Sequence, residues 1–351
     1  MARRNVVVLM GGVSSEHEVS VASGTKVVQS LDRGRYDVAP VLITKEGIWQ
    51  FPGAAPMSIH DAAPELRRRH VDCVFIALHG AFGEDGRIQG MLDLLGIPYT
   101  SSGCAASGLA IDKLRSKAIV AAAGILVAPH RELTLAEWEA EADRITAETA
   151  TCFGFPCVVK SPCQGSSVGM AIPRDEAAFR NSIPEVFAYG DILMIEKFIS
   201  GAEVTCAVLD VDAAALPVAL PVTEIRPVSS AYFDYHAKYT PGASLEITPA
   251  EIPAELTRKV QEVAVRAHQL IGCSIWSRSD FIIDMEEPIW LEVNTVPGMT
   301  GTSLYPQAAA AAGISYEQLV GLFVEAAIAK SEMAQCRERE VHLMNPDADS
   351  V

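Results

Sequence analysis

Three short apolar runs near the start of the chain predict β-strands. They are residues 6–10 (VVVLM), 38–43 (VAPVLI) and 73–78 (CVFIAL), and each is rich in β-branched or other apolar side chains. The segment 19–31, between the first two runs, is amphipathic and has the spacing of a helix. Because strands and helices alternate, we expect a parallel sheet covered by helices.

The rest of the chain predicts further strands and helices. A strand at 96–100 is followed by a Ser/Gly/Ala stretch at 101–108, which we interpret as a hinge before a domain boundary near residue 112. The later elements expected from the pattern are a helix over Asp112–Ala123, a strand over Pro156–Lys160, a helix at 175–187, a strand at 192–197, a helix at 250–271, a hairpin at 280–293 and Ala-rich helices over 306–331. A polar, aromatic-rich loop is expected at 226–242, and the tail after about residue 336 is expected to fray.

Charge and cysteine content narrow the classes of function. The formal net charge of -16 opposes binding to nucleic acid or to an anionic membrane surface, so a polyanionic ligand would need a local cluster of lysine and arginine. The first apolar run is too short for a signal peptide or a membrane span, and we expect a cytoplasmic protein. The eight cysteines form no C-x-x-C pair, which favours buried free thiols over a disulfide framework or a zinc site.

The hairpin at 280–293 carries the most informative polar pattern. If its strands pair symmetrically about Glu286, Asp280 lies opposite Glu292 and Arg278 lies opposite Asn294. Residues opposite each other on paired strands share a face, and so do residues two positions apart on one strand. The four polar groups would therefore lie together on one face, at the open end of the hairpin. Two carboxylates and an amide oxygen suit Mg²⁺, and the guanidinium could meet phosphate charge.

The alternative for this hairpin is a solvated edge with incidental charges. The site is favoured because the opposite face would be a core face with four apolar residues, Phe281, Ile283, Leu291 and Val293.

A Gly/Ser loop at 164–170 (QGSSVGM) follows the strand that ends at Lys160. Small residues let several backbone N–H groups converge on an anion, while Lys160 and Lys113 could supply point charges to phosphates. The loop does not have the G-x-x-x-x-G-K-[ST] pattern, and an ordinary surface turn is an equal alternative.

Two polar residues follow strand ends in the N-terminal part of the chain. Ser15 and Glu18 have capping-box spacing, which leaves Glu16 available to pair with a substrate ammonium. His79 lies just past another strand end, although a histidine with a structural role is the more common case. Further on, the segment 195–203 (IEKFISGAE) has the pattern of an edge strand that could read a purine and bind ribose hydroxyls, with a solvent-facing strand as an equal alternative.

Together these segments resemble the D-alanine-D-alanine ligases of the ATP-grasp superfamily, from about residue 5 to residue 330. The motifs that carry the resemblance are GGVSSEHEVS (11–20), HGAFGEDG (79–86), DKLRSK (112–117), QGSSVGM (164–170), IEKFISGAE (195–203), FDYHAKY (233–239) and EVNTVPGMTGTSL (292–304). The resemblance implies an α/β fold in which an N-terminal parallel-sheet pre-ATP-grasp domain precedes a two-part α+β ATP-grasp fold. The expected units are the N-terminal substrate domain 1–111, the central lid domain 112–199, the C-terminal catalytic domain 200–335 and a flexible tail 336–351.

The resemblance also implies how ATP and metal would be held. Lys113 and Lys160 would contact the phosphates, Glu196, Lys197 and Ile199 would lie around adenine, and Glu203 would bind ribose. Asp280, Glu292 and Asn294 would hold two Mg²⁺ ions, with Mn²⁺ as an alternative.

Further roles are implied for the groups around the amino-acid substrates. Glu16 would hold the ammonium of the first D-alanine with His79 nearby, and Ser303 and Leu304 would receive the carboxylate of the second. Arg278 and the Gly298 backbone N–H would stabilise the oxyanion. Ser166 and Tyr239 would join Glu16 in a hydrogen-bonded set that closes the loop 226–242, which also carries Lys238 as an expected substrate-binding residue.

The implied activity is the ATP-dependent joining of two D-alanine molecules through a D-alanyl phosphate, for peptidoglycan precursor synthesis, by a homodimer. The sequence departs from the family at Lys160, which is followed by Ser161-Pro162 where Lys-Pro is usual, and at Arg278, which has serines on both sides. The alternatives are a D-Ala-D-Ser or D-Ala-D-lactate ligase, or a non-catalytic ATP-binding regulator. The intact polar set of the hairpin argues against the regulator, since binding alone does not need two metal ions and an oxyanion donor.

Overall fold

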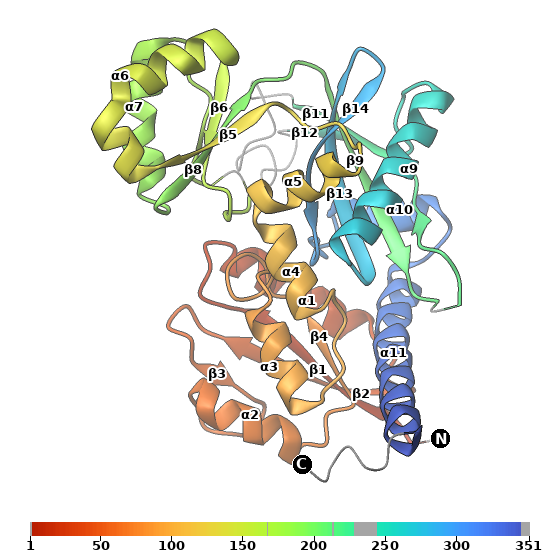
Figure 1. Ribbon diagram of the computed structural model, residues 1–351. Coiled ribbons are helices and arrows are strands. Elements are labelled where there is room, and N and C mark those ends of the chain that lie inside the picture. Colours follow the sequence, from red (N-terminus) through yellow and green to blue (C-terminus); the bar gives the residue numbers. More distant parts are fainter. Residues whose placement is uncertain (1, 167, 213, 228–243, 345–351) are drawn as a thin grey trace.

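The computed structural model of the protein describes residues 2–166, 168–212, 214–227 and 244–344, and their strands form three sheets (Figure 1). The N-terminal sheet has the order β3-β2-β1-β4. Its strands are β1 (Arg4–Gly11), β2 (Tyr36–Ile43), β3 (Trp49–Gln50) and β4 (Cys73–Ile76), and its helices are α1 (His17–Ser30), α2 (Ile59–Arg68) and α3 (Arg87–Leu95). Because β1 pairs in parallel with both β2 and β4, the predicted parallel sheet is confirmed.

The segment 96–108 differs from its prediction. Residues 96–100 form no strand, since Tyr99 makes a single parallel bridge to Val74 and the Ile76 N–H then bonds to the Thr100 hydroxyl, 3.2 Å away, instead of a backbone carbonyl. The expected hinge contains the start of helix α4 (Cys104–Ile111), which is followed directly by α5 (Lys113–Ala122). Its small side chains serve close packing, because Ala106, Ser107 and Ala110 are buried.

A second sheet has the order β5-β8-β6-β7 and antiparallel pairing throughout. Its elements are β5 (His130–Thr134), α6 (Leu135–Cys152), β6 (Cys157–Lys160), β7 (Met170–Ala171), α7 (Glu176–Phe187) and β8 (Ile192–Lys197). This sheet and its two helices have an apolar core of their own, built around Phe179, Ile183 and Leu193. In Figure 1 this unit, here called the lid, stands apart from the rest of the molecule at the upper left.

The third and largest sheet has the order β12-β11-β9-β13-β14, with β10 added beside β9. Its strands are β9 (Ala202–Asp210), β10 (Val218–Ala219), β11 (Thr223–Pro227), β12 (Ser244–Ile247), β13 (Ile275–Asp284) and β14 (Glu287–Asn294). The helices that follow or intervene are α9 (Ala254–Ile271), α10 (Leu304–Ala311) and α11 (Tyr316–Met344), so α11 extends into the segment predicted as a tail. Helix α9 starts later than predicted because the Ala250 N–H instead donates to the Val222 carbonyl, 2.8 Å away.

The β13–β14 hairpin has the predicted register at its open end. Arg278 pairs with Asn294 and Asp280 with Glu292, although the turn is the tighter pair Met285-Glu286, whose φ angles of 49° and 80° match a two-residue hairpin turn. A β-bulge after Asp280 takes up the extra residue.

The bulge corrects one predicted side-chain direction. Phe281 pairs with Trp290, and both are fully buried in the core of the large sheet. Leu291, predicted to share that core face, is the extra residue and instead lines the cleft together with its neighbour Glu292.

The N-terminal sheet and the large sheet share one apolar core. Phe323 of α11 lies 4.6 Å from Trp276 of β13 and 6.3 Å from Phe75 of β4, measured between ring centroids, and Tyr305 of α10 packs on both Trp276 and Phe323. All four rings are fully buried. The expected units 1–111, 112–199 and 200–335 each contain one sheet, but the cut near residue 112 falls between two helices whose residues Ala110 and Val120 pack into the core of the large sheet.

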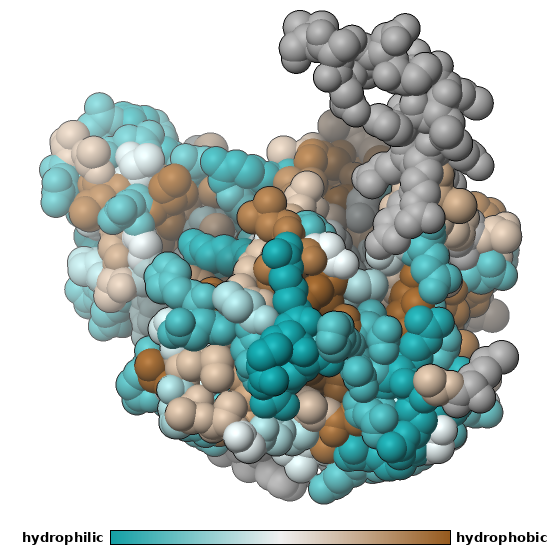
Figure 2. Space-filling model, turned by 90° about the horizontal axis from the view of Figure 1, so that it is seen from below, coloured by the Kyte–Doolittle hydropathy of each residue, from teal (hydrophilic) through white to brown (hydrophobic). Residues whose placement is uncertain are grey.

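Among the described residues, no single helix is both long and apolar enough to cross a membrane; α10 and the first part of α11 reach that composition only as a pair bent by 102°, and both contribute to the buried core. The face shown in Figure 2 is largely hydrophilic, with apolar residues in small groups. All eight cysteines are free thiols, but four of them are exposed, so the expected burial holds only for Cys73, Cys157, Cys206 and Cys273.

Phe323→Ala should lower the free energy of unfolding by about 3–5 kcal/mol, because it opens a cavity where the two sheets share their core. Urea denaturation followed by tryptophan fluorescence measures the change. Leu322→Ala is the matched control, since this neighbour is 37% exposed and its truncation should cost about 0.5 kcal/mol. Equal losses in the two variants would show that Phe323 is not central to the shared core.

Candidate active site

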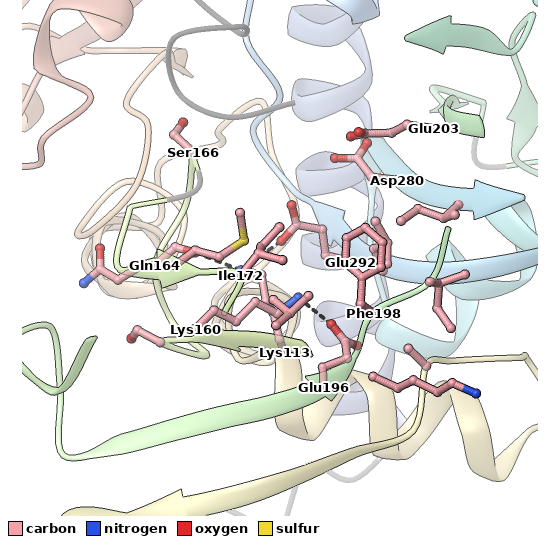
Figure 3. Close-up of a pocket in the computed structure, with 18 of the residues that line it drawn as sticks. Lys113, Lys160, Gln164, Ser166, Ile172, Glu196, Phe198, Glu203, Asp280 and Glu292 are labelled. Carbon is pink, nitrogen blue, oxygen red and sulfur yellow. Dashed lines mark hydrogen bonds and ion pairs between the residues drawn. The ribbon is translucent and has the colours of Figure 1, made fainter. Parts of the chain in front are cut away.

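A cleft that is open to solvent lies between the lid and the large sheet (Figure 3). Apolar side chains of both units line part of it, among them Val158, Ile172, Phe198, Ile282 and Leu291. The charged residues that line it are Lys113, Lys160, Glu196, Lys197, Glu203, Asp280 and Glu292. Most of the residues predicted to bind nucleotide and metal are therefore brought together in one place.

Glu196 of β8 lies between two lysines. Its carboxylate is 2.8 Å from Lys160 Nζ, on the cleft side, and 2.6 Å from Lys117 Nζ, which belongs to α5 and is fully buried. Burial alone would raise the pKa of Glu196, but the two ammonium groups outweigh it and lower that pKa to about 2. Glu196 is therefore an ionised carboxylate in a nearly solvent-free position.

Lys113, at the start of α5, connects the lid loop to the large sheet. Its Nζ lies 2.8 Å from Glu292 Oε2 and donates to the Gln164 carbonyl at 2.8 Å. Burial would lower the pKa of Lys113, but the charge and hydrogen bond of Glu292 outweigh it and raise that pKa. This lysine is thus an ion-paired cation beside the Gly/Ser loop.

The polar end of the hairpin is tightly hydrogen-bonded. Arg278 donates two bonds to Asp280, at 2.7 and 2.8 Å, and Thr205 of β9 donates a third at 2.7 Å. The Asn294 amide donates to the same carboxylate at 3.3 Å. The predicted face is therefore real, and each of its carboxylates is matched by a cation, Arg278 beside Asp280 and Lys113 beside Glu292.

The segment 195–203 was predicted to be an edge strand, and this is wrong. Strand β8 pairs with β5 on one side and β6 on the other, and the Lys197 N–H donates to the Pro129 carbonyl at 2.8 Å. Only after Lys197 does the chain leave the lid sheet, so Phe198 and Ile199 lie in the connection to β9 and line the cleft. Glu203 follows on β9, and in Figure 3 its carboxylate lies beside that of Asp280.

Glu16 lies near the Gly/Ser loop, although the two are far apart in the sequence. The Ser166 hydroxyl donates to Glu16 Oε1. Ser166 has a φ of 50°, in the left-handed region that residues other than glycine seldom adopt. A Cβ added at Gly80 or Gly165 would lie 2.8 or 2.9 Å from Glu16 Oε2. Small residues at both places therefore let two loops close around one carboxylate, which is only 8% exposed.

The predicted capping box at the start of α1 is not formed. The helix begins at His17 with Glu16 as its N-cap residue, and no side chain caps it. Glu18 instead pairs with Lys45 at the surface, 3.0 Å away. Glu16 is therefore the N-cap residue by position, but its side chain makes no capping hydrogen bond.

His79 is buried and links three segments. Its Nε2 is 3.0 Å from the Ser23 hydroxyl of α1 and its Nδ1 is 3.0 Å from the Val296 carbonyl. Burial would lower the pKa of His79, but Glu84 and Glu16 outweigh it and raise that pKa. The same Ser23 hydroxyl accepts from the Met299 N–H at 3.2 Å, so this network fixes the turn that carries Gly298.

That turn ends at the first residues of α10. Ser303 is the N-cap residue of α10, its hydroxyl accepts from the Thr300 N–H at 2.9 Å, and a Cβ on Gly298 would lie 2.9 Å from the same hydroxyl. Leu304 is the first helical residue and is buried. Tyr239 and Lys238, the two remaining predicted site residues, lie outside the described residues.

Sequence reasoning missed Lys117, Ser23 and Thr205. Lys117 closes the DKLRSK motif and stands four positions after Lys113, so helical spacing alone puts the two lysines on one face of α5. Ser23 and Thr205 gave no comparable signal, since each works through a partner that is distant in the sequence.

Comparisons with known proteins agree with this geometry. Family models described as D-ala D-ala ligase N-terminus and C-terminus match residues 5–102 and 119–325. The D-alanine--D-alanine ligase of Desulforudis audaxviator is 42% identical, with 90% of this chain and 96% of that protein covered.

Two solved structures share the fold. The D-alanine--D-alanine ligase of Bacillus anthracis complexed with ATP is 31% identical with a TM-score of 0.76, and 94% of this chain and 99% of that chain are covered. The VanG D-Ala:D-Ser ligase of Enterococcus faecalis is 29% identical with a TM-score of 0.78, and 93% and 100% are covered.

The low pKa of Glu196 predicts a pH dependence of stability. Because its folded-state pKa, about 2, lies below the ordinary value of 4.5, the stabilisation is present above pH 4.5 and is lost as pH falls toward 2. Wild type should therefore be more stable than Glu196→Gln by a constant amount between pH 6 and 8. Below about pH 4.5 this difference should shrink, by up to about 1.4 kcal/mol per pH unit for one carboxylate. Urea denaturation of both proteins from pH 3 to 8 measures it, and a difference that stays constant over the whole range would contradict the assignment.

Proposed function

The chain belongs to the D-ala D-ala ligase family, and on that premise we propose that it joins two D-alanine molecules into D-alanyl-D-alanine, with ATP as co-substrate and a D-alanyl phosphate as intermediate. The product would serve peptidoglycan precursor synthesis. The observation that carries the proposal is the cleft between lid and large sheet, where Lys113 pairs with Glu292 of the hairpin and Lys160 pairs with Glu196 of the lid.

We propose that ATP binds with its base against the apolar wall of the cleft. Phe198 and Ile199 leave the lid sheet there, and Glu196 and Lys197 end the strand before them, so adenine would lie beside the connection between the two units. Glu203, on the next strand, would accept hydrogen bonds from ribose hydroxyls. Lys113 and Lys160 would then meet the phosphates, each giving up a carboxylate partner to do so.

The donor set of the hairpin fits Mg²⁺. Asp280, Glu292 and Asn294 offer hard oxygen ligands on one face, and the described part of the chain gathers no set of three His, Cys, Asp or Glu side chains that could hold a metal by themselves. Mg²⁺ commonly takes one or two carboxylates and completes its shell with phosphate oxygens and water, which agrees with such a set. When bound, the metal would neutralise phosphate charge during the attack of one anion on another.

The carboxylate of the first D-alanine would attack the γ-phosphate, which breaks its bond to ADP and gives the D-alanyl phosphate. The deprotonated amine of the second D-alanine would then attack the acyl carbonyl, and inorganic phosphate would leave as the peptide bond forms and the amine loses a further proton. Arg278 and the Gly298 N–H would donate to the oxyanion that forms at this carbonyl. Glu16, held by Ser166, would pair with the ammonium of the first substrate, with His79 behind it. The start of α10 would accept the carboxylate of the second substrate at Ser303 and Leu304, since a helix N-terminus attracts anions.

Tyr239 and Lys238 enter the proposal from the family motif alone. We propose that Tyr239 joins Glu16 and Ser166 and that the loop 226–242 excludes water from the acyl phosphate. A homodimer in the cytoplasm is likewise the expectation from the family, and the eight free thiols agree with a reducing compartment.

A D-Ala-D-Ser or D-Ala-D-lactate ligase is the rival within the class, and the likeness to a D-Ala:D-Ser ligase makes a direct test necessary. An amine must lose its proton before it attacks, whereas a hydroxy acid carries no ammonium group. The preference for D-alanine over D-lactate should therefore rise with pH. We expect D-alanyl-D-alanine to be the main product at neutral and alkaline pH. Equimolar D-alanine, D-serine and D-lactate, offered with ATP from pH 6 to 9 and separated by chromatography, decide the matter. A main product with D-serine or D-lactate above neutral pH would replace the proposal, and absence of any ligation would reject it.

Asp280→Asn and Glu292→Gln should each raise the Mg²⁺ concentration that gives half-maximal activity, by at least about tenfold, because each removes an anionic oxygen ligand. Titration of ligation activity against Mg²⁺ measures the shift. Glu286→Gln, at the exposed turn of the same hairpin, is the control for loss of a negative charge and should leave the half-saturation concentration unchanged. Unchanged values in both site variants would show that the metal binds elsewhere.

A further inference from the structure

Lys117 is a buried lysine to which the proposed reaction gives no role. Its side chain is fully buried and does not line the cleft, and its Nζ lies 2.6 Å from Glu196 Oε1. The same Nζ donates to the Trp290 carbonyl at 3.3 Å and lies 6.0 Å from the centre of the Trp290 ring. Lys117 thus connects the lid strand β8 with the residue just before the bulge that aims Leu291 and Glu292 at the cleft.

The two lysines of Glu196 differ in what they can do. Lys160 lines the cleft and its side chain is 12% exposed, so it can turn toward a ligand. Lys117 has no exposed surface and is enclosed by Glu196 and Trp290, so it cannot. Glu196 therefore has one exchangeable cation and one resident cation.

The carboxylates that face the two cleft lysines are not equivalent. When Lys113 leaves Glu292 for a phosphate, the metal site on the hairpin offers Glu292 a replacement cation. Glu196 has no such replacement within the described residues, apart from Lys117. A buried carboxylate left without a partner is strongly destabilising.

We propose that Lys117 is a positioning residue for nucleotide binding, the resident counter-ion that keeps Glu196 paired when Lys160 moves from Glu196 to the phosphates of ATP. This rests on the proposed role of Lys160 as a phosphate ligand. Without Lys117, transfer of Lys160 leaves Glu196 buried and unpaired, so ATP binds less tightly even though Lys117 touches no part of it.

A double-mutant cycle on ATP binding tests the inference. The dissociation constant of ATP is measured by calorimetry, without D-alanine, for wild type, Lys117→Met, Glu196→Gln and the double variant. Lys117→Met should weaken ATP binding by about 10- to 100-fold in the wild-type background, where it strands the carboxylate. In the Glu196→Gln background the same change should alter the constant by less than about threefold, because no charge is left to neutralise. The Michaelis constant for D-alanine should change little in Lys117→Met.

Lys330→Met is the matched control, since Lys330 is also an ion-paired lysine, held by Asp210 and Ser274 away from the cleft. It should lower the melting temperature without a selective loss of ATP affinity. If Lys117→Met does not fold, Lys117→Gln takes its place in the cycle and keeps a donor for the Trp290 carbonyl.

Unchanged ATP affinity in the Lys117 variant, equal losses in both backgrounds, or a wild-type protein that binds no ATP would overturn the inference. If the cycle shows the expected coupling but the wild type forms no dipeptide, the inference stands and the proposed function is rejected.

Discussion

The neutralisation of buried charge is the constraint on which the cleft depends. The chain carries a formal net charge of -16, yet its cleft must receive a polyanion. Lysines must therefore be present in the cleft before the ligand binds, and their charges must be neutralised there. Carboxylates of the site neutralise them, since Glu196 forms ion pairs with Lys117 and Lys160, and Glu292 forms one with Lys113. Lys113 and Lys117 each contact both the lid and the large sheet, so these two cations also join the units, whereas Lys160 and Glu196 form a pair within the lid.

How far the sequence could predict the site follows from how local each signal is. The pairing of Asp280 with Glu292 was predictable because both residues lie in one hairpin and alternation fixes the shared face. The bulge was not, since it results from the tight turn at Met285 and from the fit of Trp290 into the core, which are tertiary effects. The face assigned to Leu291 was wrong for that reason.

The failures elsewhere have the same physical origin. Small residues at 104–108 suggested flexibility, but they permit the close packing of α4, and a sequence pattern cannot distinguish these two uses. The contacts of Glu16 with Ser166 and Gly165 depend on how the lid lies against the N-terminal unit. The resemblance to a family predicted the contact with Ser166, which local patterns could not, and the close approach to Gly165 was not predicted.

The distribution of apolar cores has a consequence for the dynamics of the molecule. Phe75, Trp276, Tyr305 and Phe323 merge the N-terminal sheet and the large sheet into one body, whereas the lid has a separate core around Phe179. Cooperative opening units tend to follow such boundaries, so the lid should exchange its backbone amide hydrogens through openings that leave the rest of the protein folded. The binding cleft then lies at the boundary between two units of different stability, and opening of the less stable unit controls access to the cleft.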